Sequence, residues 1–259
     1  MAQYLNISIS SIYYERKKYK EDKEIKPLIE EILKDNPSYG HKRIALKLNL
    51  NKKRILRIMH KYDIKPYRRR RFKLIKLDDY GKEPAIYKNE IKDLKIIRPN
   101  QVWESDFTYI KYRGCFIYLA TLIDVYAKNI VGFNISSRHN TELVLIAFEN
   151  ALLNHKSPDI SHSDQGSEYE SLKYTEFLEK VGVKISMSSK GSPWQNGYQE
   201  SFYSNFKIEL GDPNRFETKE DLIITIMNQI YYYNNERIHT SLKSSPNLFL
   251  ENFYKKMGT

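Results

Sequence analysis

The chain has 259 residues, a hydrophobic content of 41% and a single cysteine, Cys115. This length allows one large domain or a larger domain with a small companion. One cysteine excludes an internal disulfide and a cysteine-rich zinc site. No apolar run approaches the roughly 20 residues of a membrane-spanning helix, and the start "MAQYLNISIS" lacks the pattern of a secretory signal. These features favour a cytoplasmic protein of bacterial type.

The formal net charge of +11 lies entirely in the first third of the chain. Residues 1–82 hold 23 Lys and Arg against 10 Asp and Glu, whereas residues 83–259 hold 20 against 22. A solvated basic face would explain this distribution. However, the adjacent arginines Arg68, Arg69, Arg70 and Arg71 repel one another unless phosphates neutralise them. The charge pattern therefore favours a nucleic-acid-binding segment joined to a near-neutral domain.

Residues 24–64 predict three helices. Apolar residues recur at helical spacing over 24–36, and "NPSYGHKR" (36–43) interrupts them before a second helix that carries Ile44. A polar turn at 49–51 leads to a third helix, 52–64, which opens with the basic residues Lys52, Lys53 and Arg54. A short helix, a tight turn and a basic helix form the helix-turn-helix pattern. Residues 1–64 are therefore predicted to bind DNA, with a basic helical bundle as the alternative, and 65–99 to form a basic linker.

From Trp103 onward the pattern predicts an α/β domain, 100–259. Three strands are expected within 102–136, with a turn at 112–114. Helices at 140–155 and 172–182 then alternate with strands at 158–164 and 183–188. The loop "SKGSPWQNG" (189–197) precedes a long helix that begins near residue 196, and a helical extension ends the chain. This order predicts a mixed five-stranded sheet with helices on both faces.

Three acidic residues lie at the ends or edges of these elements. Asp106 is in the first strand, Asp164 follows the fourth, and Glu200 is in the helix after the Gly/Pro loop. Each alone is an ordinary polar residue. However, 57 residues separate Asp106 from Asp164, and 35 separate Asp164 from Glu200.

This spacing resembles the catalytic triad of retroviral integrases and DDE transposases. Six ordered motifs are more specific and resemble the second-frame (OrfB) transposases of insertion-sequence family three. They are "VWESDFTYI", "YLATLIDVYAKNIVGF", "HSDQGSEY", "SMSSKGSPWQNGYQES", "FKIEL" and "YYYNNERIHTSLKSSP". "YGHKRIALKLN" resembles the helical region that precedes the integrase core in that family. The resemblance covers about residues 25–250 and implies a ribonuclease H-like integrase core after a small all-α region.

The resemblance also implies the chemistry. Water would first cut a phosphodiester of DNA, and the freed 3′-hydroxyl would then attack a second one. Two Mg²⁺ (or Mn²⁺) ions would lower the pKa of the attacking oxygen and stabilise the leaving oxygen. Asp106 would bridge both ions, while Asp164 and Glu200 would each hold one. The expected partners are double-stranded DNA (the terminal inverted repeats and the target), further copies of the chain and a first-frame (OrfA-like) segment, and the expected location is the bacterial nucleoid.

Further residues follow from the same family motifs. Lys207 lies two helical turns after Glu200 and would grip DNA near the cut phosphate. Asn196 and Gln165 resemble groups that either support the metal-binding acids or position the DNA. The resemblance implies DNA contacts for Arg237 and His239 as well, with packing of the last helix against the core as the alternative. His162 has a structural role or a place beside the metal ions. Asp124 lies in a strand but is left out of the triad.

The retained triad favours an active transposase over two alternatives. One is a catalytically silent DNA-binding regulator or inhibitor of transposition that kept the fold. The other is an RNA-cleaving enzyme of the ribonuclease H class, against which the basic N-terminal region argues. Gln195-Asn196 replaces the Asp-Asn pair of many relatives and leaves the three acids intact.

Overall fold

The computed structural model describes residues 17–67, 86–189 and 192–258. The chain divides into two compact units, Met1–Arg68 and Arg69–Thr259. The predicted boundaries at residues 64 and 99 stay predictions, and residues 68–85 of the predicted linker lie outside the described residues. Within the described ranges, no helix is long and apolar enough to cross a membrane.

The first unit contains the three predicted helices. They are α2 (Lys17–Asp35), α3 (His41–Lys47) and α4 (Lys52–Lys61). Asn51 caps α4 because its side chain accepts a hydrogen bond of 2.8 Å from the backbone N–H of Lys53. The helices share a buried apolar core that includes Ile29, Ile44 and Ile55. The prediction of a small helical region before the sheet is confirmed.

The second unit contains a mixed five-stranded sheet, as predicted, in the order β3-β2-β1-β4-β5. The strands are β1 (Val102–Tyr112), β2 (Cys115–Asp124), β3 (Ile130–Ser136), β4 (Ile160–Ser163) and β5 (Lys184–Met187). The pairs β1–β2 and β2–β3 are antiparallel, whereas β1–β4 and β4–β5 are parallel. The carboxyl end of β4 therefore lies beside the central strand β1.

The hairpin between β1 and β2 turns through two residues with positive φ, Arg113 at 44° and Gly114 at 85°. Positive φ at both central positions is the geometry of a type I′ turn, which matches the twist of paired strands. The turn sets the register in which Tyr112 pairs with Cys115 and Tyr109 pairs with Tyr118. The predicted turn at 112–114 is thus confirmed.

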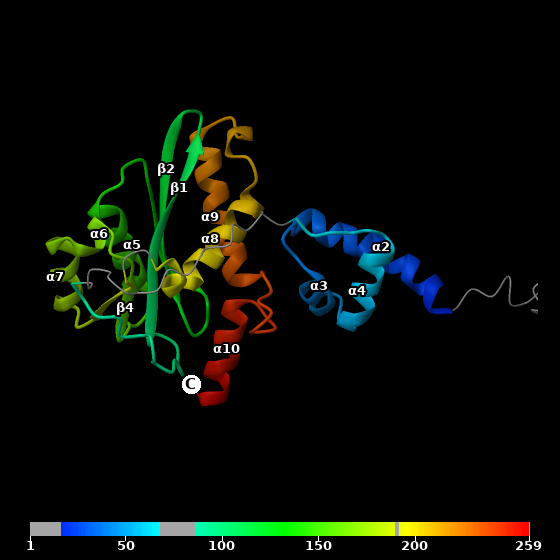
Figure 1. The fold of residues 1–259 in the computed structure, drawn as a ribbon, viewed down its shortest axis with the longest axis horizontal. Coiled ribbons are helices and arrows are strands. Elements are labelled where there is room, and N and C mark those ends of the chain that lie inside the picture. Colours follow the sequence, from blue (N-terminus) through cyan, green and yellow to red (C-terminus); the bar gives the residue numbers. More distant parts are fainter. Residues whose placement is uncertain (1–16, 68–85, 190–191, 259) are drawn as a thin grey trace, which may run out of the picture. The chain divides into compact units, whose positions relative to one another are not determined.

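Helices cover both faces of the sheet (Figure 1). One face packs against α5 (Thr141–Asn154), α6 (Ser167–Glu170) and α7 (Leu172–Lys180) around Trp103 and Phe148. The other packs against α8 (Gly197–Leu210) and α9 (Lys219–Asn235) around Leu119 and Phe206. A helix α10 (Pro246–Met257) ends the chain. The single-turn helix α6, which begins three residues after Asp164, and the short 3-10 helices at Pro193–Asn196 and Pro213–Arg215 are elements that the sequence pattern missed.

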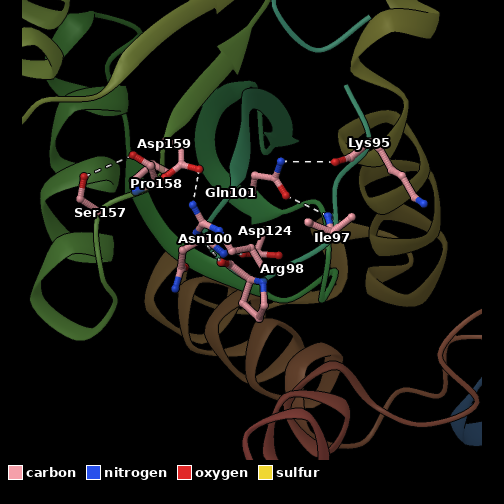
Figure 2. Close-up of polar contacts among 10 residues, drawn as sticks. Lys95, Ile97, Arg98, Asn100, Gln101, Asp124, Ser157, Pro158 and Asp159 are labelled. Atoms are coloured by element: carbon pink, nitrogen blue, oxygen red, sulfur yellow. Dashed lines mark hydrogen bonds and ion pairs between the residues drawn. The ribbon is translucent and has the colours of Figure 1, made fainter. Parts of the chain in front are cut away.

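Residues 86–101, at the end of the predicted linker, contact the sheet domain (Figure 2). The Gln101 side chain accepts a hydrogen bond from the backbone N–H of Ile97 and donates one to the carbonyl of Lys95. Arg98 forms an ion pair with Asp159, which precedes β4. Further along, the backbone N–H of Glu90 donates to Ser186 Oγ on β5. These bonds fix the path of the chain into β1.

Candidate active site

Asp106 lies near the middle of the central strand β1 and is partly exposed. Its carboxylate accepts a 2.8 Å hydrogen bond from the backbone N–H of Phe107. Burial and, to a smaller extent, the charges of Asp164 and Glu200 together raise the pKa of Asp106 to about 7, against the lowering effects of the Phe107 hydrogen bond and the charge of Lys207. The three predicted acids therefore share one electrostatic neighbourhood.

Asp164 follows the end of β4, where its side chain is exposed. Its Oδ1 accepts a 3.0 Å hydrogen bond from the backbone N–H of Gly166. The surrounding protein partly desolvates this exposed carboxylate, and this desolvation and the nearby charge of Glu168 raise the pKa of Asp164. A Cβ at Gly166 would lie 3.1 Å from Asp164 Oδ1 and 3.2 Å from Glu168 Oε2, so this glycine leaves room for two carboxylates at the turn.

Glu200 is exposed in the first turn of α8. A fourth acid, Glu104, forms hydrogen bonds with the backbone at the start of that helix. Glu104, two residues before Asp106, accepts hydrogen bonds from the backbone N–H groups of Tyr198 (3.1 Å) and Gln199 (3.4 Å). These N–H groups have no carbonyl partner within the helix, so a carboxylate there caps α8 from the neighbouring strand. Burial raises the pKa of Glu104 to about 8, although the bonds from Gln199 and Tyr198 oppose the shift.

Polar side chains of α8, and of Asn196 just before it, donate hydrogen bonds to backbone carbonyls of β1 and β2. The buried Gln199 donates to the carbonyls of Glu104 (2.7 Å) and Thr121 (2.9 Å). The Tyr203 hydroxyl donates to the carbonyl of Asp106 at 2.8 Å, and Asn196 donates to the carbonyl of Ser105 at 3.2 Å. Glu200 therefore sits on a helix that is hydrogen-bonded to the strand of Asp106.

Sequence reasoning missed Glu104 and Gln199. Both belong to quoted motifs, "VWESDFTYI" and "NGYQES", but their role depends on contact between segments more than 90 residues apart in the chain. The available signal for Glu104 was a second acid two residues from Asp106 in the same strand.

The candidate metal ligands at this site are carboxylate oxygens. Three carboxylates suit a hard cation such as Mg²⁺, which prefers oxygen ligands and keeps several waters. Among residues 17–67, 86–189 and 192–258, no three His, Cys, Asp or Glu side chains are already grouped as a metal site. A metal ion would therefore have to draw in the exposed carboxylates of Asp164 and Glu200. Their electrostatic coupling to Asp106 fits that demand.

Asp124 has a structural role, consistent with its exclusion from the triad. It is buried, and its carboxylate accepts hydrogen bonds from the backbone N–H groups of Ala127 (2.8 Å) and Asn100. Figure 2 shows Asp124 beside Asn100 at the entry to β1. His162 is fully buried, with Nδ1 2.8 Å from Ser186 Oγ, and burial lowers its pKa to about 4. These features agree with a structural role for His162 rather than a place beside the metal ions.

The predicted DNA-contact residues differ widely in exposure. Lys207 is partly exposed, with Nζ 5.1 Å from the centre of the Tyr109 ring. Asn196 is buried at the start of α8, and Gln165 donates to the carbonyl of Ser188 at 3.0 Å. Arg237 is 1% exposed, and its Nε lies 3.0 Å from Glu209 Oε1. This burial agrees with the alternative that Arg237 has a packing role rather than a DNA contact. Lys207 is thus the basic residue placed beside the acids.

His239 is partly buried and makes an edge-to-face contact of 5.0 Å with the Tyr233 ring. In the first unit, Lys52 and Lys53 are exposed, whereas Arg54 lies 3.2 Å from the buried carboxylate of Asp22. Burial opposes the charge of Asp22, but hydrogen bonds and charges from Arg57 and Arg54 hold its pKa below the ordinary value. Arg68, Arg69, Arg70 and Arg71 lie outside the described residues.

The fold belongs to the ribonuclease H-like class of integrase cores. An integrase core domain model matches residues 97–193, and a second one matches residues 181–246. The HTLV-2 integrase catalytic core domain, solved in complex with magnesium, superposes with a TM-score of 0.50 at 18% identity. The match covers 58% of this chain and 96% of that one. This likeness confirms the predicted fold.

Two relatives identify the family. The transposase of insertion sequence IS904 from Lactococcus lactis (strain IL1403) is 42% identical over 57% of this chain and 60% of its own length. The putative transposase InsK of IS150 from Escherichia coli K12 is 30% identical over 90% of this chain and 86% of its own length. The chain belongs to the insertion-sequence transposases with an integrase core domain, as its motifs indicated. It spans about 60% of the IS904 transposase.

Proposed function

We propose that this chain cuts and joins DNA strands as a DDE transposase, with Asp106, Asp164 and Glu200 as the catalytic carboxylates. The proposal rests chiefly on the coupling of Asp106 to the two other acids, whose charges raise its pKa. Perturbed acids grouped around one strand are typical of a catalytic site. Membership of the transposase family supports the same reading.

The proposed cofactor is a pair of divalent metal ions, Mg²⁺ or Mn²⁺, held by these three acids. Integrase-type enzymes generally use divalent ions, and the HTLV-2 core was solved with magnesium. Three ionised carboxylates close together repel one another. Bound cations would reduce this repulsion. The ions would lower the pKa of the attacking oxygen and stabilise the leaving oxygen.

The chain's own residues prepare this site in specific ways. Without metal, the raised pKa of about 7 makes Asp106 easier to protonate than an ordinary aspartate. Tyr203 fixes the backbone at Asp106, and Glu104 fixes the start of α8, which positions Glu200. Lys207 adds a positive charge near Asp106, where it would bind the phosphate next to the cut bond.

The proposed substrate is double-stranded DNA, namely the element's terminal inverted repeats and the target. Helices α3 and α4, with Lys52 and Lys53 exposed at the start of α4, are the proposed binding module. We propose that further copies of the chain and a first-frame segment complete the assembly on DNA. The reaction would take place on the bacterial nucleoid, in the cytoplasm.

A strand cleavage and joining assay tests this function. Labelled duplexes that carry the element's ends are incubated with the full chain and MgCl₂, MnCl₂ or EDTA, and the products are separated on denaturing gels. We expect metal-dependent nicks at the element ends and joined products. These products should fall by at least about a thousandfold in Asp106→Asn, Asp164→Asn and Glu200→Gln. Asp159→Asn, on an exposed ion pair, is the matched control and should retain activity.

Other outcomes distinguish the alternatives. Unimpaired DNA binding without nicking, also after addition of the first-frame segment, would favour the catalytically silent regulator. Cleavage of an RNA–DNA hybrid without joining of DNA ends would favour a ribonuclease H. Cleavage that persists in Glu200→Gln would remove Glu200 from the site.

A further inference from the structure

Aromatic rings form a row on the β1–β2 hairpin. Tyr109 and Tyr118 are directly opposite across the two strands. The ring centres of Tyr109 and Phe116 are 5.4 Å apart, those of Phe116 and Tyr118 6.3 Å, and those of Tyr118 and His139 5.3 Å. We call Tyr109, Phe116, Tyr118 and His139 the ring row. Each ring contacts the next, so the row is continuous.

One end of the ring row reaches the acidic site. The ring of Phe107, the residue after Asp106, lies 4.6 Å from the His139 ring. His139 Nε2 lies 3.0 Å from Glu168 Oε1, and the charge of Glu168 acts on Asp164. The His139 end of the row is therefore connected to Asp164 through Glu168.

The other end of the row is open to solvent and positively charged. Tyr109 is 58% exposed and Phe116 is 45% exposed. Lys207 Nζ lies 5.1 Å from the centre of the Tyr109 ring, and the exposed Lys111 pairs with Phe116 across the hairpin. Exposed rings beside cations are the combination that binds a nucleic acid strand, because bases stack on the rings while phosphates meet the cations.

We propose that the ring row binds unpaired nucleotides of the DNA strand next to the phosphate that is cut. A base in an intact duplex has both faces covered by its neighbours, so only a base freed from the duplex can stack on a protein ring. Through Glu168 at its His139 end and Lys207 at its Tyr109 end, the row lies near the groups whose charges act on Asp164 and Asp106. It would thus hold the end of a locally opened strand while the acids act on the adjacent phosphate. The inference rests on the proposed function for the position of the cut, but stacking can be measured without cleavage.

Fluorescence anisotropy tests the proposal on the full chain in a Glu200→Gln background, which keeps the DNA intact. The two probes are a labelled single-stranded 12-mer and the blunt duplex of the same sequence. The readout is the ratio of the two affinities, because the basic first unit contributes to both. We expect Tyr109→Ala and Phe116→Ala each to weaken single-strand binding about tenfold, with little change for the duplex.

Three matched variants separate stacking from folding. Tyr109→Phe and Phe116→Tyr keep a ring and should bind the single strand like the parent chain. Tyr231→Ala removes a Tyr that is 65% exposed on α9, away from the row, and should change neither affinity. Photo-crosslinking of a 5-iodouracil probe, followed by mass spectrometry, should place the adduct on Tyr109 or Phe116.

Equal loss of single-strand and duplex binding in Tyr109→Ala and Phe116→Ala would overturn the inference, and so would no loss at all. A change of oligomeric state in light scattering with unchanged affinities would assign the row to contact between copies instead. Absence of metal-dependent cleavage by the wild-type chain, with stacking intact, would refute the proposed function rather than the ring row.

Discussion

Glu104 Oε2 on the central strand lies 3.1 Å from the backbone nitrogen of Tyr198, near the start of helix α8. The bond joins β1, which carries Asp106, to the helix that carries Glu200. A side-chain oxygen at a helix N-terminus accepts from N–H groups that have no partner within the helix. We infer that Glu104 positions Glu200 relative to Asp106 without itself being a catalytic residue.

Replacing Glu104 tests this role. Glu104→Ala should lower the free energy of unfolding by about 1–3 kcal/mol, because it leaves the N–H groups of Tyr198 and the buried Gln199 without their acceptor. Glu104→Gln keeps an acceptor oxygen and should restore most of this loss. Chemical denaturation at pH 6 measures both. Equal stability of the wild type and Glu104→Ala would show that the bond does not hold the helix.

The raised pKa of Glu104 predicts a pH dependence of stability. The folded chain binds the proton more tightly than the unfolded chain, since the pKa of Glu104 is about 8 against the ordinary value of 4.5. The contribution of this group to stability is therefore full below about pH 4.5 and falls as the pH rises toward 8. Glu104→Gln should flatten the fall in denaturation curves between pH 5 and pH 8. An equal loss of stability with rising pH in the wild type and in Glu104→Gln would contradict the claim that the folded chain disfavours ionisation of Glu104.

Replacing Asp106 should change both the stability of the metal-free chain and the response of its melting temperature to Mg²⁺. Asp106→Asn should stabilise the metal-free chain by about 1–3 kcal/mol at pH 8, because it removes a carboxylate whose ionised form is disfavoured. Millimolar Mg²⁺ should raise the melting temperature of the wild type but not of Asp106→Asn. Asp159→Asn serves as the control and should keep the Mg²⁺ response. Thermal denaturation by circular dichroism reads out all three.

Asp124 should behave as a structural residue. Asp124→Ala is expected to lower stability by about 2–4 kcal/mol, since the N–H groups of Asn100 and Ala127 lose their acceptor. Its Mg²⁺-induced shift in melting temperature should match that of the wild type. Loss of the shift in a variant that stays folded at the assay temperature would place Asp124 in the metal site after all.

The first unit offers a pair of contrasting basic residues. Lys52→Ala should leave stability unchanged and lower the slope of log affinity against log salt by about one, if it contacts a DNA phosphate. Arg54→Ala should destabilise the unit because it removes a partner of the buried Asp22. Titrations of a labelled duplex at several salt concentrations, together with melting curves, separate the two. A flat salt response would exclude phosphate binding by this unit.

Local patterns predicted the strands and most helices because those signals lie within short windows. Alternation and β-branched residues mark β1 and β2, and the Arg113–Gly114 turn is written in two adjacent residues. The positions of Asp106, Asp164 and Glu200 on their elements were predictable for the same reason. Their electrostatic coupling comes from the parallel pairing of β1 with β4 and from the packing of α8, which no short window contains.

Contacts between distant segments account for what the sequence did not predict. Glu104 became a helix cap because α8 returns to β1 after more than 90 residues. Arg54, predicted to contact DNA, lies beside Asp22 from another helix. The ring row joins neighbours on a hairpin to His139, which lies beyond the next strand. Each depends on tertiary packing rather than on local propensity.

The central claim is that Asp106, Asp164 and Glu200 gather around divalent metal. Iron-directed cleavage of the chain tests it most directly. Fe²⁺ bound in place of Mg²⁺ is oxidised to Fe³⁺ by added hydrogen peroxide, which yields hydroxide and a hydroxyl radical that cuts the nearby backbone, and ascorbate regenerates the Fe²⁺. We predict cuts near residues 106, 164 and 200, suppressed by excess Mg²⁺ and lost in Glu200→Gln. Cuts confined to other carboxylates, or a pattern unchanged in Glu200→Gln, would contradict the claim.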